Sequence, residues 1–348
     1  MSKQLLDLLN KITPESESTQ HERYMLIDGL NLFFRNFSAI NAVNSNGAHI
    51  GGVGGFFRSL GALMRQIQPT KVYVVFDGQG SSTNRKNIIP EYKSSRNLTR
   101  VTKHELFDNL DDEDESKVSQ IVRIVQYLKT LPVHTVTRNG VEADDIIAYL
   151  ASTLLQNADD RAFIVSSDKD YLQLVSQQTI VYRPIEKEYY TADTVMEKFN
   201  IPPHNFILYK VLMGDNSDGV SGIKGLGPKT LLKRFPELTG DYLSLDDLLD
   251  ICEKKIEEHI VYARVLHDIE TIRNKYTVMN LANPMMSDAD KHFIDSFVAT
   301  SQTNFDPDLF VEMYHKDQMG GLIKNVEGWI QTTFRDLLQP QNWFIYSQ

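Results

Sequence analysis

Residues 23–28 read RYMLID, a short apolar stretch that ends in an aspartate. Stretches of the same kind recur along the chain, short, apolar and rich in β-branched residues: KVYVVFD (71–77), VHTVT (133–137), AFIVSSD (162–168) and TIVYR (179–183). Helical patterns separate the early ones, including GGFFRSLGALMRQI (54–67) and SKVSQIVRIVQYLKTL (116–131). Apolar strands that alternate with helices predict an α/β fold with a mostly parallel central sheet flanked by helices.

The composition is that of an ordinary globular protein. The chain has 348 residues, of which 41% are hydrophobic and 24% charged, enough for one large domain or two modest ones. No apolar run approaches the ~20 residues that span a bilayer, and the N-terminus lacks the pattern of a signal peptide. A single cysteine, Cys252, favours a reducing, cytoplasmic location and excludes a cysteine zinc site.

Carboxylates follow the predicted strands. Because the carboxyl ends of parallel strands share one edge of a sheet, we expect these side chains to converge although they are scattered in sequence. A further pair lies in GDNSD (214–218), with a spacing that suits one face of a helical turn. The set comprises Asp28, Asp77, Glu142, Asp144, Asp145, Asp168, Asp170, Asp215 and Asp218.

So many carboxylates cannot stay ionised together unless cations lie between them. Taken singly, a strand-end aspartate is more often a loop or cap residue, but the whole set favours a metal site. Oxygen ligands select Mg²⁺, with Mn²⁺ as a substitute. The net charge of −10 argues against a nucleic-acid partner, and two or three divalent ions would offset much of it. Such ions bind phosphate-bearing substrates and hydrolyse phosphodiesters, which predicts a nuclease.

The segment after residue 77 is long, polar and poor in apolar periodicity. It contains Arg85, Tyr92, Lys93 and Arg96, which could offer a stacking surface and cations for phosphates. A solvated loop is the alternative, and these residues alone favour it. We interpret the acidic run at 111–116 as a solvated turn.

A glycine-rich stretch, GIKGLGPKT, occupies residues 222–230. It differs from a nucleotide-binding P-loop because Pro228 precedes the lysine and no buried strand leads into it. We interpret it as a turn between two helices, whose backbone N–H groups approach a DNA phosphate without reading bases. A purely structural turn is the alternative, and nearby lysines argue against it. The predicted contacts are Gly222, Gly225, Gly227 and Lys229.

These motifs together resemble the structure-specific 5′ nucleases, the family of flap endonucleases and 5′–3′ exonucleases, in its phage and bacterial branch. PEYKSSR (90–96) and VEADD (141–145) carry the likeness, which runs from about residue 23 to about residue 275. The resemblance implies a PIN-like nuclease core at 21–200 and a helix–three-turn–helix DNA-binding region at 201–275. A helical arch would occupy about 84–120. Outside the likeness, the sequence pattern predicts a leader at 1–20 and a helical extension at 276–348.

The resemblance also implies roles for individual residues. Asp28, Asp77, Glu142 and Asp144 would hold one metal, with Asp145 a ligand through water. Asp168 and Asp170 would lie between the metals, and Asp215 and Asp218 would complete the second site. Lys93 and Arg96 would contact the scissile phosphate. Arg35 and Lys229 would contact DNA, with K⁺ at the glycine-rich turn.

By resemblance the enzyme would cleave 5′ flaps and 5′ ends of branched DNA, and RNA in RNA–DNA hybrids, during replication, primer removal or repair. Its partners would include single-strand binding protein, a sliding clamp or a polymerase, with the nuclease itself a monomer. QTTFRDLL (331–338) loosely resembles a clamp-binding peptide, but an amphipathic helix is the preferred interpretation.

The sequence departs from the family pattern in two respects, and two alternative functions are open. Gly219 occupies a position where the family commonly has Asn, and the acidic run is unusual in a DNA gateway. A PIN-type ribonuclease would share the carboxylates but lack the glycine-rich turn and the arch. A non-catalytic DNA-binding module would not need intact acids at both metal sites.

Overall fold

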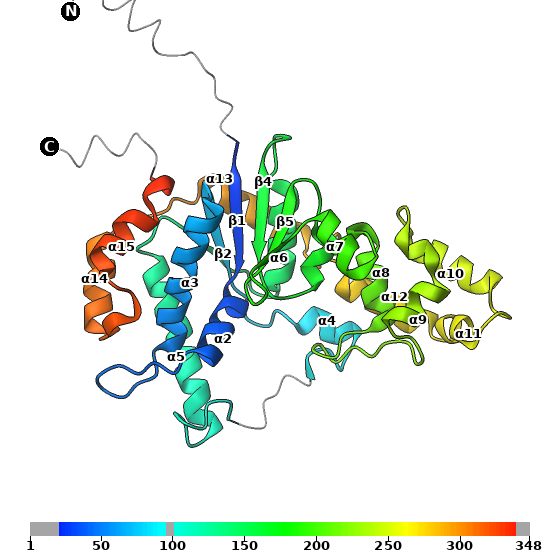
Figure 1. Ribbon diagram of the computed structural model, residues 1–348, viewed down its shortest axis with the longest axis horizontal. Helices are drawn as coiled ribbons and strands as arrows, with labels where there is room; N and C mark the ends of the chain where they lie inside the picture. Colours follow the sequence, from blue (N-terminus) through cyan, green and yellow to red (C-terminus); the bar gives the residue numbers. More distant parts are fainter. Residues whose placement is uncertain (1–20, 95–100, 339–348) are drawn as a thin grey trace, which may run out of the picture.

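The computed structural model describes residues 21–94 and 101–338. Its centre is a six-stranded sheet in the order β3-β2-β1-β4-β5-β6 (Figure 1). Every neighbouring pair from β3 to β5 is parallel, and β6 runs antiparallel to β5. The mostly parallel α/β sheet predicted from the sequence is therefore confirmed. The strands are β1 (Arg23–Asp28), β2 (Lys71–Val75), β3 (His134–Val136), β4 (Arg161–Val165), β5 (Thr179–Arg183) and β6 (Glu188–Tyr190).

Strand β1 lies in the middle of the sheet and is buried on both faces. Met25 and Ile27 belong to one hydrophobic core, whereas Tyr24 and Leu26 belong to the other. This division follows from the two-residue period of a strand, and helices on both faces explain why residues 24–27 are all apolar.

Each face of the sheet is covered by helices from both halves of the sequence (Figure 1). The first core includes residues of α2 (Gly29–Ala39), α3 (Gly51–Ile67) and α5 (Leu110–Leu128), together with α14 (Pro307–Lys316) and α15 (Val326–Thr333). The second includes residues of α6 (Ala143–Thr153), α7 (Ala192–Phe199) and α13 (Asp288–Thr300). The C-terminal helices therefore complete both cores.

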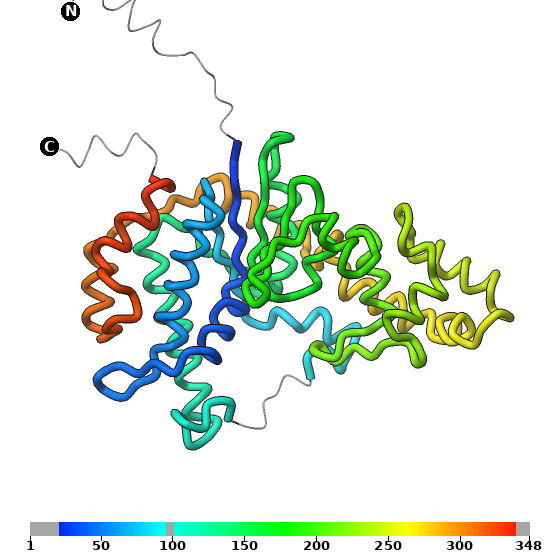
Figure 2. Tube along the Cα trace, in the orientation of Figure 1, coloured from blue at the N-terminus to red at the C-terminus, as the bar shows by residue number. Residues whose placement is uncertain are grey.

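A third core lies at one end of the molecule, on the right in Figure 1. It is built on α8 (Phe206–Met213), α9 (Pro228–Arg234), α10 (Leu245–Lys254), α11 (Ile260–His267) and α12 (Ile269–Met279). Helix α4 (Thr83–Ile88) contacts α12, and Tyr92, which follows α4, is buried in this core. Figure 2 shows this cyan segment running from the sheet towards the helical end.

The acidic run at 111–116 forms the first turns of α5, so the expectation of a solvated turn is wrong. Asn109 caps the helix by accepting a hydrogen bond from the Asp112 N–H, and acidic side chains stabilise a helix N-terminus. Glu113 is fully buried and accepts a hydrogen bond of 2.7 Å from the Thr102 N–H. The residues that neighbour Glu113 in the chain gave no sign that the Thr102 N–H would bind its carboxylate.

Some predictions fall outside the described residues. The leader at 1–20 lies there, as does Arg96, for which a phosphate contact is predicted. Within 21–94 and 101–338, no helix combines the length and apolarity that crossing a bilayer requires. In the stretch that loosely resembles a clamp-binding peptide, Phe334 is fully buried in the first core.

Candidate active site

The predicted strand-end acids meet at the carboxyl edge of the sheet. Asp28 ends β1, Asp77 follows β2 and Asp168 follows β4, and these three strands are neighbours. With Asp144, from the first turn of α6, they line one pocket of about 410 Å³. The convergence is a consequence of parallel strand order, because each βα connection returns the next strand to the same edge.

Local hydrogen bonds hold these carboxylates in place. Asp28 caps α2 by accepting from the Asn31 N–H at 2.9 Å, and it also accepts from the Ser166 hydroxyl at 3.2 Å. Asp77 accepts from the N–H of Ala143 at 2.7 Å, which ties β2 to the start of α6. Asp144 accepts from the hydroxyl of the buried Tyr171 at 2.5 Å.

The carboxylates are close enough to perturb each other's protonation. Burial and the neighbouring Asp144 and Asp77 raise the pKa of Asp28 well above its ordinary value. Burial and Asp144 also raise the pKa of Asp168. Crowded acids with raised pKa values form a region of strong negative potential, which divalent cations would relieve.

Glu142, which directly precedes α6, is not among the residues that line this pocket and is 1% exposed. Its Oε2 accepts hydrogen bonds from Lys93 Nζ at 2.8 Å and from the Tyr92 hydroxyl at 3.1 Å. Burial raises its pKa, although the charges of Arg85 and Lys93 act in the opposite direction. Its Oε1 is also buried and has no hydrogen-bond partner among the described residues. An unsatisfied buried carboxylate oxygen is unusual and suits a metal ligand.

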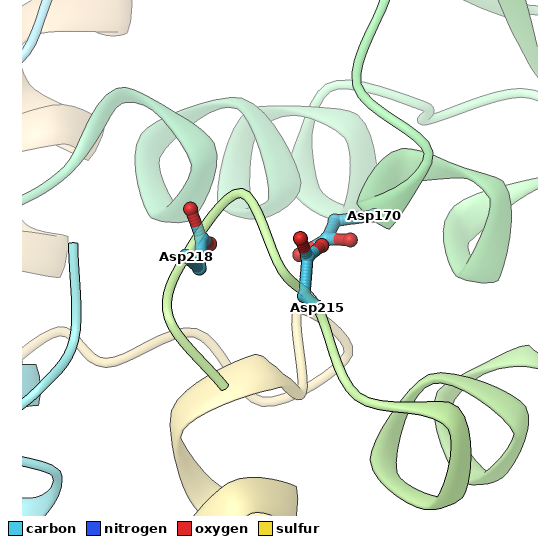
Figure 3. Close-up of side chains that lie close together, drawn as sticks. All are labelled: Asp170, Asp215 and Asp218. Atoms are coloured by element: carbon cyan, nitrogen blue, oxygen red, sulfur yellow. The ribbon is translucent and has the colours of Figure 1, made fainter. Parts of the chain in front are cut away.

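A second group of carboxylates lies beside the first. Asp215 and Asp218 come from the loop after α8, and Asp170 starts a short 3-10 helix after β4 (Figure 3). One oxygen of each can be chosen so that all lie within 4.8 Å of one another. Burial and the charge of Asp168 raise the pKa of Asp170 well above its ordinary value.

Lys210 contacts two members of this second group. Its ammonium forms ion pairs with Asp170 and Asp215, and the residue is 6% exposed. Although burial acts to raise the pKa of Asp215, Lys210 and hydrogen bonds from Ser217 lower it to about 2. Lys210 was not among the residues predicted from the sequence. The available signal was a single charged residue within the apolar helix FILYKVLM (206–213).

Asp145 pairs with Arg85, whose Nη1 also lies 3.3 Å from Glu142 Oε2. The guanidinium donates to both carboxylate oxygens at 2.6 and 2.9 Å, and Asp145 also accepts from the Met285 N–H. Arg85 is 3% exposed. Its predicted role as a DNA contact is corrected here, because the structure commits its guanidinium to a buried ion pair. The same ion pair engages both carboxylate oxygens of Asp145, so Asp145 has a structural role in this arrangement.

Tyr92 needs the same correction. We predicted a stacking surface for bases, but the ring is 3% exposed within the third core and its hydroxyl donates to Glu142. Apolar packing around the ring decided this position, and sequence proximity to lysine did not reveal it.

Lys93 and Arg35 both line the pocket of carboxylates. Lys93 has a positive φ of 56°, and its N–H donates to the Asp218 carbonyl oxygen at 2.8 Å. Gly219 also has a positive φ, 72°, a conformation that Gly and Asn adopt most readily. A glycine at position 219 is therefore compatible with the backbone conformation of this loop.

The glycine-rich stretch forms the end of the connection from α8 to α9. Gly222 packs tightly, since a Cβ there would lie 2.1 Å from the Met213 carbonyl oxygen. Gly225 has a φ of 88°, whereas Gly227 faces open space. Lys229 is exposed in the first turn of α9. Close backbone packing thus explains why a glycine occupies position 222. Gly227 and Lys229 remain accessible to a ligand.

The donor set fits hard divalent cations. Both groups consist of carboxylate oxygens, which Mg²⁺ and Mn²⁺ prefer, and the nearby Glu142 has a buried oxygen without a hydrogen-bond partner among the described residues. Asp28, Asp77, Asp144 and Asp168 could hold one ion. Asp170, Asp215 and Asp218 could hold another.

Comparisons with known proteins agree with this geometry. Residues 23–200 match the family described as the 5′-3′ exonuclease, N-terminal resolvase-like domain. The chain is 34% identical over 230 residues to a 5′-3′ exonuclease of Aquifex aeolicus, covering 66% of this chain and 73% of that protein. It is 34% identical over 248 residues to DNA polymerase I of Mycobacterium tuberculosis. That match covers 69% of this chain but only 26% of the polymerase.

Among solved structures, the bacteriophage T5 flap endonuclease in complex with DNA and metal ions has a similar fold. The TM-score is 0.59 at 18% identity, and the alignment covers 91% of this chain and all of the phage protein. This likeness supports the arrangement of the sheet and its surrounding helices.

Proposed function

The chain belongs to the 5′-3′ exonuclease family, whose members are phosphodiester hydrolases, and we propose that it is a Mg²⁺-dependent nuclease that cleaves 5′ flaps and removes 5′ ends. One observation carries this proposal. The carboxylates that follow β1, β2 and β4 share a pocket with Asp144, and two of them have raised pKa values. Such a pocket suits divalent ions and the phosphate groups that accompany them.

The proposed chemistry uses two ions, one for each group of carboxylates. When bound, such ions supply a water nucleophile of lowered pKa and offset charge on the phosphate. Hydrogen bonds within the chain position the carboxylates that would hold these ions. Asp144 is fixed by Tyr171, and Asp77 is fixed by the start of α6. Lys93 lines the same pocket and would neutralise phosphate charge together with Arg96.

The DNA duplex is proposed to contact the loop between α8 and α9. Gly227 and Lys229 offer a backbone approach and a cation for a phosphate, a contact that is independent of base sequence. We propose that this segment is a helix–three-turn–helix motif and that it binds K⁺ near the glycine-rich turn. Arg35 would contact the strand that enters the pocket, because it lines the pocket from α2.

The wider activity is also proposed. The chain spans about a quarter of the DNA polymerase I that it matches, so what belongs to that whole polymerase is not transferred. We propose that this nuclease acts as a monomer on branched DNA and on RNA hybridised to DNA, removing primers during replication. A polymerase, a sliding clamp or single-strand binding protein would supply the context.

The decisive experiment uses a 5′-labelled flap duplex with Mg²⁺, with EDTA and with the Asp168→Asn variant. We expect cleavage near the flap junction with Mg²⁺, none with EDTA, and a loss of at least about 100-fold in the variant. Asp159→Asn is the matched control, because Asp159 is exposed before β4 at the opposite edge of the sheet. It should cleave like the wild type.

Two other outcomes would replace the proposal. Equal cleavage of linear single-stranded RNA and of the flap would favour a PIN-type ribonuclease. Flap binding without cleavage under any metal condition would favour a non-catalytic DNA-binding module.

A further inference from the structure

Lys210 occupies an unexpected position for a lysine in a candidate metal site. It lies on α8 and is almost fully buried, and its ammonium contacts the carboxylates of both Asp170 and Asp215. These two residues come from separate segments, one after β4 and one after α8. A single buried cation therefore bridges the two segments that build the second group of carboxylates.

A buried ammonium is costly unless it is paired, and buried carboxylates are costly for the same reason. The ion pairs of Lys210 with Asp170 and Asp215 offset the cost of burying the ammonium and the cost of burying the carboxylates. Asp170 and Asp215 are also two of the three carboxylates whose oxygens can approach within 4.8 Å, the set suited to a divalent ion. The lysine therefore contacts the carboxylates that an ion would use. A positive charge so close to them must oppose the binding of a second positive charge.

We propose that Lys210 is an internal counter-ion of the second carboxylate group. Before metal binds, it holds Asp170 and Asp215 together and prevents their repulsion from opening the site. When a divalent ion binds there, the lysine weakens that binding by charge repulsion. The second site is thereby kept of low affinity, so that it fills together with a phosphate-bearing substrate. This inference rests on the proposed metal site, and it gives Lys210 a positioning role.

The test is Lys210→Met, which keeps most of the side-chain volume and removes the charge. Binding of Mn²⁺ to the DNA-free protein is followed by the electron paramagnetic resonance signal of the free ion. We expect the weaker class of sites to bind Mn²⁺ at least about tenfold more tightly in the variant. In EDTA the variant should melt at a lower temperature than the wild type, and Mn²⁺ should raise its melting temperature by more.

Lys275→Met is the matched control. Lys275 is also buried, but its ammonium donates to the Ser221 carbonyl oxygen. Removing it should lower the melting temperature without changing Mn²⁺ affinity. Lys210→Arg should keep the wild-type pattern, because it retains the charge.

The outcomes separate this inference from the proposed function. Unchanged or weaker Mn²⁺ binding in Lys210→Met overturns the counter-ion role, even if the wild type cleaves flaps. Tighter binding in the variant supports the role, even if no flap is cleaved. If Lys210→Met does not fold in EDTA, refolding in Mn²⁺ should rescue it, and failure of that rescue overturns the inference.

Discussion

At Arg85 and Asp145 a base and an acid meet with almost no access to water. The guanidinium binds both carboxylate oxygens, and its Nε donates to the Val278 carbonyl oxygen at 2.9 Å. The pair therefore ties α4, at the base of the proposed arch, to α6 and to the end of α12. Breaking a buried pair leaves one charge uncompensated, which costs far more than the loss of a surface ion pair.

Arg85→Met should lower the free energy of unfolding by about 3–5 kcal/mol, because Asp145 would remain buried without its partner. Urea denaturation followed by circular dichroism measures this. Lys86→Met, at an exposed neighbouring position, should change stability by no more than about 0.5 kcal/mol.

A different result would restore the DNA-contact hypothesis. In that case Arg85→Met would keep its stability and bind flap DNA more weakly.

At the scale of elements, the loop between α8 and α9 packs on the base of the proposed arch. The Lys93 N–H bonds to the Asp218 carbonyl oxygen, and a Cβ on Gly219 would lie 2.8 Å from the Glu91 carbonyl oxygen. The segment that follows α4 and the loop that carries Asp215 and Asp218 therefore position each other. A change in one should be felt at the carboxylates of the other.

Gly219→Ala should lower the free energy of unfolding by about 1–3 kcal/mol, since its positive φ and the contact with Glu91 both oppose a side chain. Flap cleavage should fall as well, because Lys93 would shift relative to Glu142. Urea denaturation and the labelled-flap assay measure the two effects.

Gly227→Ala is the comparison for stability. Its backbone is extended, with φ −123° and ψ 170°, and no heavy atom among the described residues lies within 4 Å of the new Cβ. It should fold with wild-type stability while binding duplex DNA more weakly. Equal stability of the Gly219 and Gly227 variants would show that the packing of this loop on the arch base is unimportant.

At the scale of the whole molecule, the C-terminal helices are part of the nuclease core. Phe310 of α14 is fully buried, with its ring centroid 5.4 Å from that of Phe57 and 4.9 Å from that of Tyr127. Trp329 of α15 lies against Gly61, where a Cβ would come within 2.5 Å of the indole. Helices α14 and α15, which lie beyond the family match, thus cover one face of α3 and α5 and exclude water from it.

Phe310→Ala should lower the free energy of unfolding by about 3–5 kcal/mol, because it leaves a cavity among aromatic rings. A single cooperative urea transition is expected, since the ring belongs to the same core as β1 and β2. Leu309→Ala, at the exposed neighbouring position, should cost much less. Two separate transitions, with only the smaller affected, would mean that α14 and α15 fold independently.

The sequence was informative where physical chemistry is local or periodic. Alternation of strands and helices identified the parallel sheet, and the aspartates at strand ends indicated a common edge before any contact was known. Positive φ at Gly219 and close packing at Gly222 were not visible in the glycine pattern, because both depend on distant backbone segments. The burial of Glu113 was hidden for the same reason.

By itself, therefore, the sequence determined the fold class and the convergence of Asp28, Asp77 and Asp168, since strand periodicity and parallel connections place them at one edge. Only the tertiary structure decided which of the acids pair with a buried base. Arg85 and Asp145 lie 60 residues apart, and Lys210 reaches Asp170 from another segment. Such pairings depend on packing between distant elements, and no local pattern of residues specifies them.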